Sequence, residues 1–405
     1  MCEWYNLRLD KAQSISNMSD VLLRSELQIS NIETNKQFCR LAEKTQVVFP
    51  GKHSEVIRNR QTHSYEVATS ASIMALSIAQ KKNWASLSVD YQGSIKPCSL
   101  CHDLGLGALG HDGATILDAY FKSKGLDEGF CDNNNTIVVI EKNNIMVSRY
   151  TICSVIKYPE KMYASQKLKY ADLLALSIKE DKDHFLTLGL DLIDQKRTIA
   201  CQVMDEADRN SYVTSDLSDF FCLGNTLSVD VIKAAANKID LAYRYTELST
   251  LLSVLRSADK SSIKSYFNNL KNQFNMNYTM TEEGVTVINK DLHAYREFLW
   301  DIEFEYYIKP IRNRIFHEQN VGKFRNYIDR VVDGGFTPSR TYALAIEQAQ
   351  SPEEKLRAQR DMIGEVTDFY VTEIHLRAQL ADGVPNQSIV GVFGSNYPNS
   401  MVSDI

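Results

Sequence analysis

Apolar side chains recur at helical spacing along most of the chain. In segment 62–82 they fall three and four residues apart, as on one face of an α-helix, at Val67, Ala71, Met74, Ala75 and Ile78. The same period predicts helices at 112–124, 148–158 and 167–184, and two or three helices within 228–274 broken near Asp259. Only 8 prolines and 18 glycines interrupt the pattern. We therefore expect an all-α protein.

The C-terminal half adds three features to this pattern. Segment 278–289 alternates apolar and polar residues, which is compatible with one small β-hairpin. Segment 291–317 predicts a long aromatic helix that Pro310 kinks. Ser351, Pro352 and Glu354 have the order of a helix start, and the helix that follows should run to about residue 380. Residues 384–405 are rich in Asn, Ser, Gly and Pro, and we expect a flexible tail.

Composition narrows the class of protein. The chain has 405 residues, of which 44% are hydrophobic and 24% charged, which is typical of a globular protein. A net charge of -6 argues against a bulk nucleic-acid binder. No apolar run is long enough for a membrane span, the N-terminal stretch has no secretory pattern, and eight scattered cysteines suit reduced thiols. These features predict a cytoplasmic protein.

Residues able to bind a metal occur in three predicted helical segments. His102 and Asp103 are adjacent, and an imidazole beside a carboxylate can chelate one divalent cation. His63 lies at the start of an upstream helix. Asp172 stands in an apolar helical stretch, where a carboxylate is costly to bury unless it is paired or bound to metal. Such a mixed nitrogen and oxygen site would accept Mg, Mn, Fe, Co or Zn.

Several ordered motifs resemble those of the HD-domain deoxynucleoside triphosphate triphosphohydrolases, the dGTPase family. They are Arg40–Val47, Arg58–Val67, Cys101–Gly105 with Gly110 and His111, Gly129–Phe130 with Asn133, Ile156–Pro159, and Asp361–Tyr370. The resemblance covers residues 37–185 and 357–371 and is only loose in 190–350. It implies an HD-domain helical bundle with a C-terminal helical extension. It also implies hydrolysis of dGTP, or a broader set of dNTPs, to a deoxynucleoside and inorganic triphosphate.

The resemblance assigns roles residue by residue. His63, His102, Asp103 and Asp172 match the metal ligands, with Mg or Mn the preferred ion. His111 matches the catalytic histidine, which donates a proton to the leaving 5′-oxygen. Arg60 matches a phosphate-contacting arginine, and Glu180, eight residues after Asp172, falls where the family has an aspartate near the sugar 3′-hydroxyl. Further candidates for substrate contact are Arg58, Asn133, Lys157 and Tyr370.

Two departures from the family affect catalysis. Ala114 stands where a glutamate normally partners the catalytic histidine, and Leu176 stands where a tyrosine stacks near the sugar. Asp112 or Asp118 could replace the glutamate, and we favour Asp118 because it shares a helical face with Ala114. The departures keep two alternatives open: an HD phosphohydrolase of other regiochemistry, such as a nucleotidase or phosphodiesterase, and a dNTP-binding sensor that does not cut its ligand.

The predicted organisation has four parts. An N-terminal arm (1–36) precedes the HD phosphohydrolase core (37–190), and a helical region (191–383) completes the pocket and the oligomer contacts before the tail (384–405). The resemblance implies a homo-oligomer, a tetramer or hexamer, with single-stranded DNA or a nucleotide as a possible effector. We expect no membrane partner.

Overall fold

The computed structural model describes residues 21–47, 58–84, 92–237, 244–257, 259–312, 315–333 and 340–381. The predicted tail 384–405 and residues 1–20 of the predicted arm lie outside the described residues. The described chain is helical apart from one two-stranded antiparallel sheet. The predicted all-α class and the small hairpin are therefore confirmed.

The N-terminal half contains the helices that surround the site. They are α2 (Val21–Glu33), α3 (Lys36–Cys39), η1 (Arg40–Glu43), α4 (Arg60–Lys82), α6 (Gln92–Cys101), α7 (Gly110–Ser123), α8 (Asp132–Lys142), α9 (Arg149–Ser154), η2 (Pro159–Lys161), α10 (Ala164–Thr187) and α11 (Ile199–Cys222).

The C-terminal half begins with short helices and the hairpin, in which Tyr278 pairs with Val287. Its elements are α12 (Val229–Ala236), α13 (Arg244–Ser257), α14 (Lys260–Asn275), β1 (Tyr278–Thr281), β2 (Gly284–Val287), α15 (Lys290–Glu303), η3 (Phe304–Ile308), α16 (Lys309–Arg312), α17 (Ile315–Val332), α18 (Arg340–Glu347), α19 (Pro352–Gly364) and α20 (Asp368–Ala381). None of the helices in this or the preceding half, as far as the structure describes them, combines the length and apolar composition that a membrane crossing requires.

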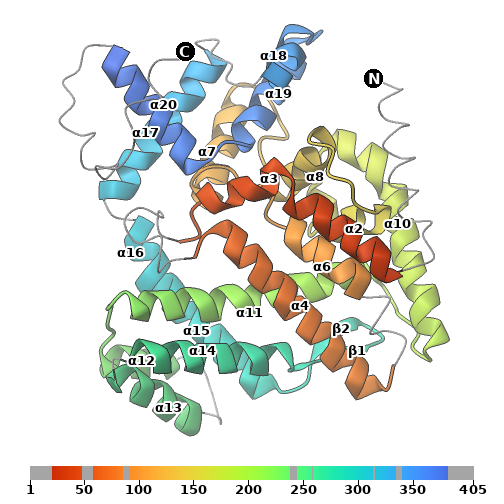
Figure 1. The fold of residues 1–405 in the computed structure, drawn as a ribbon, viewed down its shortest axis with the longest axis vertical. Helices are drawn as coiled ribbons and strands as arrows, with labels where there is room; N and C mark the ends of the chain where they lie inside the picture. Colours follow the sequence, from red (N-terminus) through yellow and green to blue (C-terminus); the bar gives the residue numbers. More distant parts are fainter. Residues whose placement is uncertain are drawn as a thin grey trace.

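Three hydrophobic clusters hold the described helices together. The first joins α2, α4, α6, α9 and α10 to the beginning of α11. The second joins the end of α11 to α12–α15. The third packs α7 against α17–α20. Figure 1 shows α11 lying across α4, with α12–α15 beyond it and α17–α20 gathered at the opposite end of the molecule. Helix α11 therefore links two of the three clusters.

Three predicted segments differ from the structure. Residues 199–222, which lie in the predicted helical region 191–383 but were not assigned to an individual helix, form the long buried helix α11. The helix predicted from Ser351 to about 380 is two helices, because the backbone leaves the helical path between Gly364 and Asp368. The aromatic helix is interrupted by the π-helical turn η3, which ends just before Pro310, the residue that cannot donate a helical hydrogen bond.

Candidate metal centre

The first turn of α4 is fixed by a capping box. The Asn59 side chain accepts a hydrogen bond from the Thr62 amide, and the Thr62 hydroxyl accepts one from the Asn59 amide. This cap sets the direction in which Arg60 and His63 leave the helix. Both side chains are buried, and Arg60 Nε donates to the carbonyl oxygen of Thr45 at 3.0 Å.

The end of α6 supplies the adjacent imidazole and carboxylate. Helix α6 stops at Cys101, so His102 and Asp103 occupy the turn that follows. His102 Nδ1 donates to the carbonyl oxygen of Ser99 at 2.7 Å. Because that bond keeps the proton on Nδ1, the lone pair of Nε2 is available to a metal. His102 is 5% exposed, so its imidazole lies in the interior rather than on the surface.

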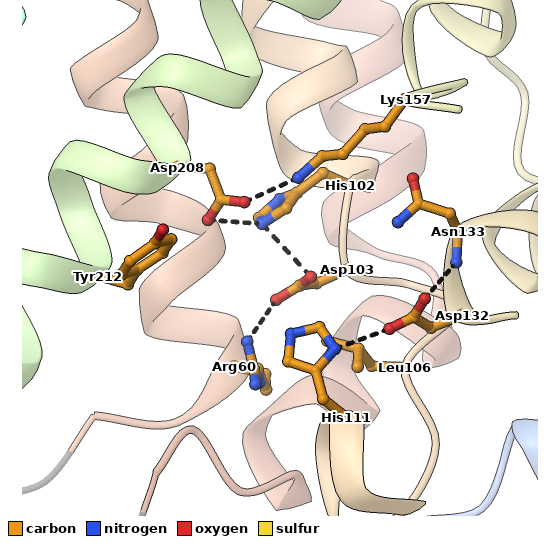
Figure 2. Close-up of a pocket in the computed structure, with 10 residues that line it drawn as sticks. All are labelled: Arg60, His102, Asp103, Leu106, His111, Asp132, Asn133, Lys157, Asp208 and Tyr212. Atoms are coloured by element: carbon orange, nitrogen blue, oxygen red, sulfur yellow. Dashed lines mark hydrogen bonds and ion pairs between the residues drawn. The ribbon is translucent and has the colours of Figure 1, made fainter. Parts of the chain in front are cut away.

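Helix α11 brings the second carboxylate. Asp208 Oδ1 lies 3.0 Å from His63 Nε2 and 3.5 Å from His102 Nε2. Ligand atoms of His63, His102 and Asp208 all lie within 4.8 Å of one another. Asp103 Oδ1 is 3.4 Å from His102 Nε2. Side chains from α4, the α6 turn and α11 thus converge on one point. Figure 2 shows the part of this group that the α6 turn and α11 supply, with His102 linked to both Asp103 and Asp208.

The donor set fits a divalent cation. His102 Nε2 is buried and has no hydrogen-bond partner among the described residues. An unpaired buried nitrogen is costly, and coordination to a metal would remove that cost. The group of His63, His102 and Asp208 could therefore bind a metal ion. Two imidazoles with carboxylate oxygen suit Zn, Fe, Co or Mn, and the carboxylates also suit Mg.

Charge at the centre favours the ionised carboxylates. Burial raises the pKa of Asp208, but Lys157 and His102 lower it by more, so it lies well below its usual range. Asp103 behaves alike: burial raises its pKa, and His102 and Arg60 more than reverse the effect. Burial lowers the pKa of His102, while Asp103 and Asp208 raise it above its usual value. A metal would compete with a proton at this imidazole.

A pocket opens beside the metal-binding group. It encloses about 410 Å³ of space, including the open space at its mouth. It is lined by Arg60, His102, Asp103, Leu106, His111, Asp132, Asn133, Lys157, Asp208 and Tyr212. Arg60 Nη1 donates to Asp103 Oδ2 at 3.0 Å, and Lys157 Nζ to Asp208 Oδ2 at 2.8 Å. Two positively charged side chains, Arg60 and Lys157, therefore lie in the pocket beside the metal-binding group.

His111 lies at the rim of the pocket, at the start of α7. A turn with positive φ at Leu109 (61°) and Gly110 (56°) delivers it there. Asp368 holds this turn from the C-terminal region, because its carboxylate accepts from the Leu109 amide at 2.6 Å and from the Thr45 amide at 2.7 Å.

The partner of His111 is not the residue we predicted. His111 Nδ1 lies 2.9 Å from Asp132 Oδ2, whereas Asp118 binds Lys122 at 2.8 Å and the Phe130 amide at 3.1 Å. Asp118 therefore serves to hold the segment between α7 and α8. Asp132 was not predicted, although Gly129, Phe130 and Asn133 beside it belong to a family-like motif; in the structure Asp132–Asn135 is the first turn of α8.

Two residues predicted on α10 do not reach the pocket. Asp172 is exposed, because the buried stripe of α10 consists of Gln166, Tyr170, Leu174, Ser177, Asp181 and Phe185, and Asp172 lies off that stripe. Glu180 is also exposed and pairs with Arg149 near the surface. The structure therefore replaces Asp172 by Asp208 as the carboxylate that meets His63 and His102.

Two further predicted contacts lie outside the pocket lining. Arg58 is paired with Asp219 and, at 2.8 Å, with Glu66, so it is committed to carboxylates of α11 and α4. Tyr370 packs in the third hydrophobic cluster, where its ring centroid lies 6.1 Å from that of Tyr327. The predicted residues Arg60, Asn133, Lys157 and His111 do line the pocket.

A sequence signal for Asp208 existed. The helix period places four aspartates on one face of α11: Asp205, Asp208, Asp216 and Asp219. Such a stripe within an apolar helix predicts buried carboxylates that need partners. Four and eight residues after Asp208 come Tyr212 and Asp216, on the same face, where the same spacing from Asp172 had given Leu176 and Glu180.

Comparison with known proteins gives one consistent likeness. No family model matches the chain. It is 29% identical over 214 residues to deoxyguanosinetriphosphate triphosphohydrolase-like protein 2 of Mesorhizobium japonicum, covering 46% of this chain and 43% of that protein. It is 26% identical over 264 residues to the deoxyguanosinetriphosphate triphosphohydrolase-like protein of Listeria monocytogenes, covering 54% and 55%.

A third relative extends the overlap. The deoxyguanosinetriphosphate triphosphohydrolase-like protein of Shewanella woodyi is 26% identical over 283 residues, covering 58% of this chain and 62% of that protein. The chain spans about half the length of the curated relatives it matches. These likenesses support a relation to the dGTPase-like proteins.

Proposed function

We propose that the protein hydrolyses a deoxynucleoside triphosphate, dGTP or a broader dNTP set, to the deoxynucleoside and inorganic triphosphate in a metal-dependent reaction. The observation that carries the proposal is the convergence of His63, His102 and Asp208 beside a pocket with two cations and a rim histidine. The names of the relatives support the same reaction.

His63, His102 and Asp208 would hold the cation, with Asp103 as the fourth ligand. When bound, a divalent cation acidifies water and neutralises charge on a phosphoryl oxygen. Mg and Mn are the preferred ions, with Fe, Co or Zn as alternatives. The Ser99 carbonyl keeps His102 in the ligating tautomer, and the Arg60 guanidinium orients Asp103.

The triphosphate would lie along Arg60 and Lys157. Each uses one hydrogen bond on a carboxylate of the metal group and has further N–H donors for phosphate oxygens. The N-termini of α7 and α8 also reach the pocket, through His111, Asp132 and Asn133. Neither helix has a side-chain cap bond at its N-cap, and a helix N-terminus favours an anion.

The sugar would lie against α11. With Asp208 as a ligand, the tyrosine and the aspartate that the resemblance implies fall on Tyr212 and Asp216. Tyr212 lines the pocket, and its ring packs against Trp300 with centroids 5.1 Å apart. Asp216 is buried and accepts a hydrogen bond from Gln46 at 3.3 Å. We propose that Tyr212 stacks on the deoxyribose and that Asp216 accepts the 3′-hydroxyl.

In the proposed reaction, water attacks the α-phosphorus and the bond from that phosphorus to the 5′-oxygen breaks. The electron pair stays on the 5′-oxygen, which takes a proton from His111. The attacking water gives up two protons, of which one restores His111 and the other passes to solvent. The products are a deoxynucleoside and triphosphate, and the oxygen of the water ends in the triphosphate.

The test is incubation with each dNTP and Mn²⁺ or Mg²⁺ in ¹⁸O-labelled water, with ion-exchange chromatography and mass analysis. We expect labelled inorganic triphosphate and unlabelled deoxynucleoside, and neither product from D208N. Release of orthophosphate or a nucleoside monophosphate would identify the alternative nucleotidase or phosphodiesterase. Binding of dNTP without turnover under both metals would identify the alternative sensor. A tetrameric or hexameric assembly, control by nucleotide or single-stranded DNA, and a cytoplasmic location stay predictions.

A further inference from the structure

His111 is placed to transfer a proton but needs a partner that fixes its ring. Its side chain is 64% exposed, so packing alone does not hold it. The position three residues later, where a carboxylate could reach it along the helix, is Ala114. The carboxylate that does reach it is Asp132, with Oδ2 at 2.9 Å from His111 Nδ1.

The two oxygens of Asp132 have separate tasks. Oδ1 accepts a hydrogen bond from the Asn133 amide at 2.8 Å, which fixes the carboxylate at the start of α8. Oδ2 is then aimed at His111. The Asp132 side chain is 18% exposed, so it is held more firmly by its surroundings than the exposed His111 ring. Figure 2 shows the second ring nitrogen of His111 turned into the pocket toward Arg60 and Asp103.

The start of α8 is itself locked to the metal-binding turn. A Cβ on Gly105 would lie 2.1 Å from the carbonyl oxygen of Asp132, so only glycine allows the two segments to approach this closely. The Thr136 hydroxyl accepts from the Gly105 amide at 3.1 Å and donates to the carbonyl oxygen of His102 at 3.2 Å. The position of Asp132 is therefore set relative to His102 and Asp103.

Building on the proposed function, we propose that Asp132 is the positioning residue of His111: it accepts a hydrogen bond from Nδ1–H and thereby directs Nε2 into the pocket, where the doubly protonated ring donates the Nε2 proton. It supplies the role that Ala114 cannot. The interaction is reciprocal. Burial raises the pKa of Asp132, but the hydrogen bond and the charge of His111 lower it by more, so the carboxylate stays ionised at neutral pH.

The first experiment does not need turnover. In ¹⁵N-histidine-labelled protein, the His111 signals are assigned by their loss in H111Q. We expect the neutral ring of the wild type to carry its proton on Nδ1, and the ring of D132N to shift toward protonation on Nε2. Asp127 is exposed in the same connection between α7 and α8, and D127N is the matched control. An identical tautomer in wild type and D132N overturns the proposal.

The second experiment measures the consequence. We expect D132N to lower kcat for triphosphate release by at least about tenfold with KM within threefold, because proton transfer but not binding is affected. D132E, and A114E in the D132N background, should each restore part of kcat, since each returns a carboxylate to His111. A kcat of D132N equal to that of D127N overturns the proposal, as does a loss that neither D132E nor A114E restores and that a lower Tm accompanies.

The two experiments separate this proposal from the proposed function. If the wild type releases no triphosphate from any dNTP, the proposed function is wrong, and the tautomer of His111 still decides whether Asp132 positions the ring. If the wild type is active and the tautomer and kcat of D132N are unchanged, only the positioning role is wrong.

Discussion

Helices α10 and α11 have the same length, 24 residues, and carry the same spacing of candidate residues, but only α11 lies at the site. On α10 the series is Asp172, Leu176 and Glu180; on α11 it is Asp208, Tyr212 and Asp216. Helix α10 buries one narrow stripe, whereas most of α11 is buried, including three of its four aspartates, and the fourth, Asp208, is half-buried. Spacing alone does not distinguish the two helices.

The difference lies in what surrounds each carboxylate. Asp172 and Glu180 face solvent and need no partner, while Asp208 is ionised between Lys157 and two imidazoles. A carboxylate in the interior stays charged only where it has partners. Because α11 lies in the interior, its aspartates need such partners and are candidates for metal binding or catalysis, unlike the exposed carboxylates of α10. Substitutions at matched positions of the two helices test this difference.

The largest effect is expected for the first matched positions, Asp208 on α11 and Asp172 on α10. D208N should weaken Mn²⁺ binding by more than about 100-fold, because loss of a ligand costs more than loss of its outer partners, and should abolish turnover. D172N should bind Mn²⁺ as the wild type does. Isothermal titration calorimetry measures both. If D172N lost Mn²⁺ binding while D208N retained it, Asp172 on α10 would be the metal ligand and Asp208 would not.

The next largest effect on activity is expected for Asp216 on α11, with Glu180 on α10 as its matched control. D216N should raise the free-energy barrier for dNTP hydrolysis, lowering kcat/KM by roughly 10- to 100-fold, because a hydrogen bond to a charged acceptor is lost. E180Q, on the surface of α10, should stay within twofold. A 3′-deoxy substrate supplies the check: D216N should no longer discriminate against it. If D216N and the wild type discriminated equally against the 3′-deoxy substrate, Asp216 would not contact the 3′-hydroxyl.

The same variant should change stability in a pH-dependent way. Burial raises the pKa of Asp216 from 3.8 to about 6, with His63 opposing the shift. Between these values the unfolded chain has lost the proton and the folded chain keeps it, so the stability of the wild type falls as pH rises. D216N lacks this loss and should be more stable above pH 6, by at most roughly 3 kcal/mol. Thermal unfolding from pH 4 to 8 measures the difference, which should vanish near pH 4.

A smaller effect, on substrate binding, is expected for Tyr212 on α11, with Leu176 on α10 as its matched control. Y212L should raise KM by roughly 2- to 10-fold, the worth of an aromatic contact, with less change in kcat. L176A removes an exposed leucine and should leave KM as it is. Steady-state kinetics with the preferred dNTP compares them. A larger KM effect in L176A than in Y212L would contradict the placement of the sugar against α11.

The smallest effect is expected at Asp118, which sequence spacing suggested as the partner of His111. Its carboxylate binds Lys122 and the Phe130 amide, and an asparagine can still accept from that amide. D118N should therefore keep kcat within about threefold of the wild type, since an exposed i,i+4 ion pair contributes little. A loss as large as that in D132N would restore Asp118 as the partner.

The spacing of apolar residues predicted the helical class and the hairpin, because that signal is local in the sequence. The residues of α4, the α6 turn and the α7 start were predicted from short motifs that resemble the family, and these motifs are also local. Asp208 and Asp132 were missed because their roles depend on tertiary packing: one lies on a helix whose burial only the fold reveals, the other meets His111 from 21 residues away. Arg58 matched a motif, yet its carboxylate partners on α11 and α4 engage it.

Asp368 belongs to neither α10 nor α11, yet its carboxylate accepts hydrogen bonds from two backbone strips next to the pocket, one at Thr45 and one at Leu109. The first strip carries the carbonyl that orients Arg60, and the second leads into His111. A chain shortened to end before α20 would retain every metal ligand while both strips came loose together. In the proposed reaction such a truncation should reach both halves of the site: it would free His111, the proton donor, and Arg60, which holds Asp103, although Asp368 itself does not line the pocket.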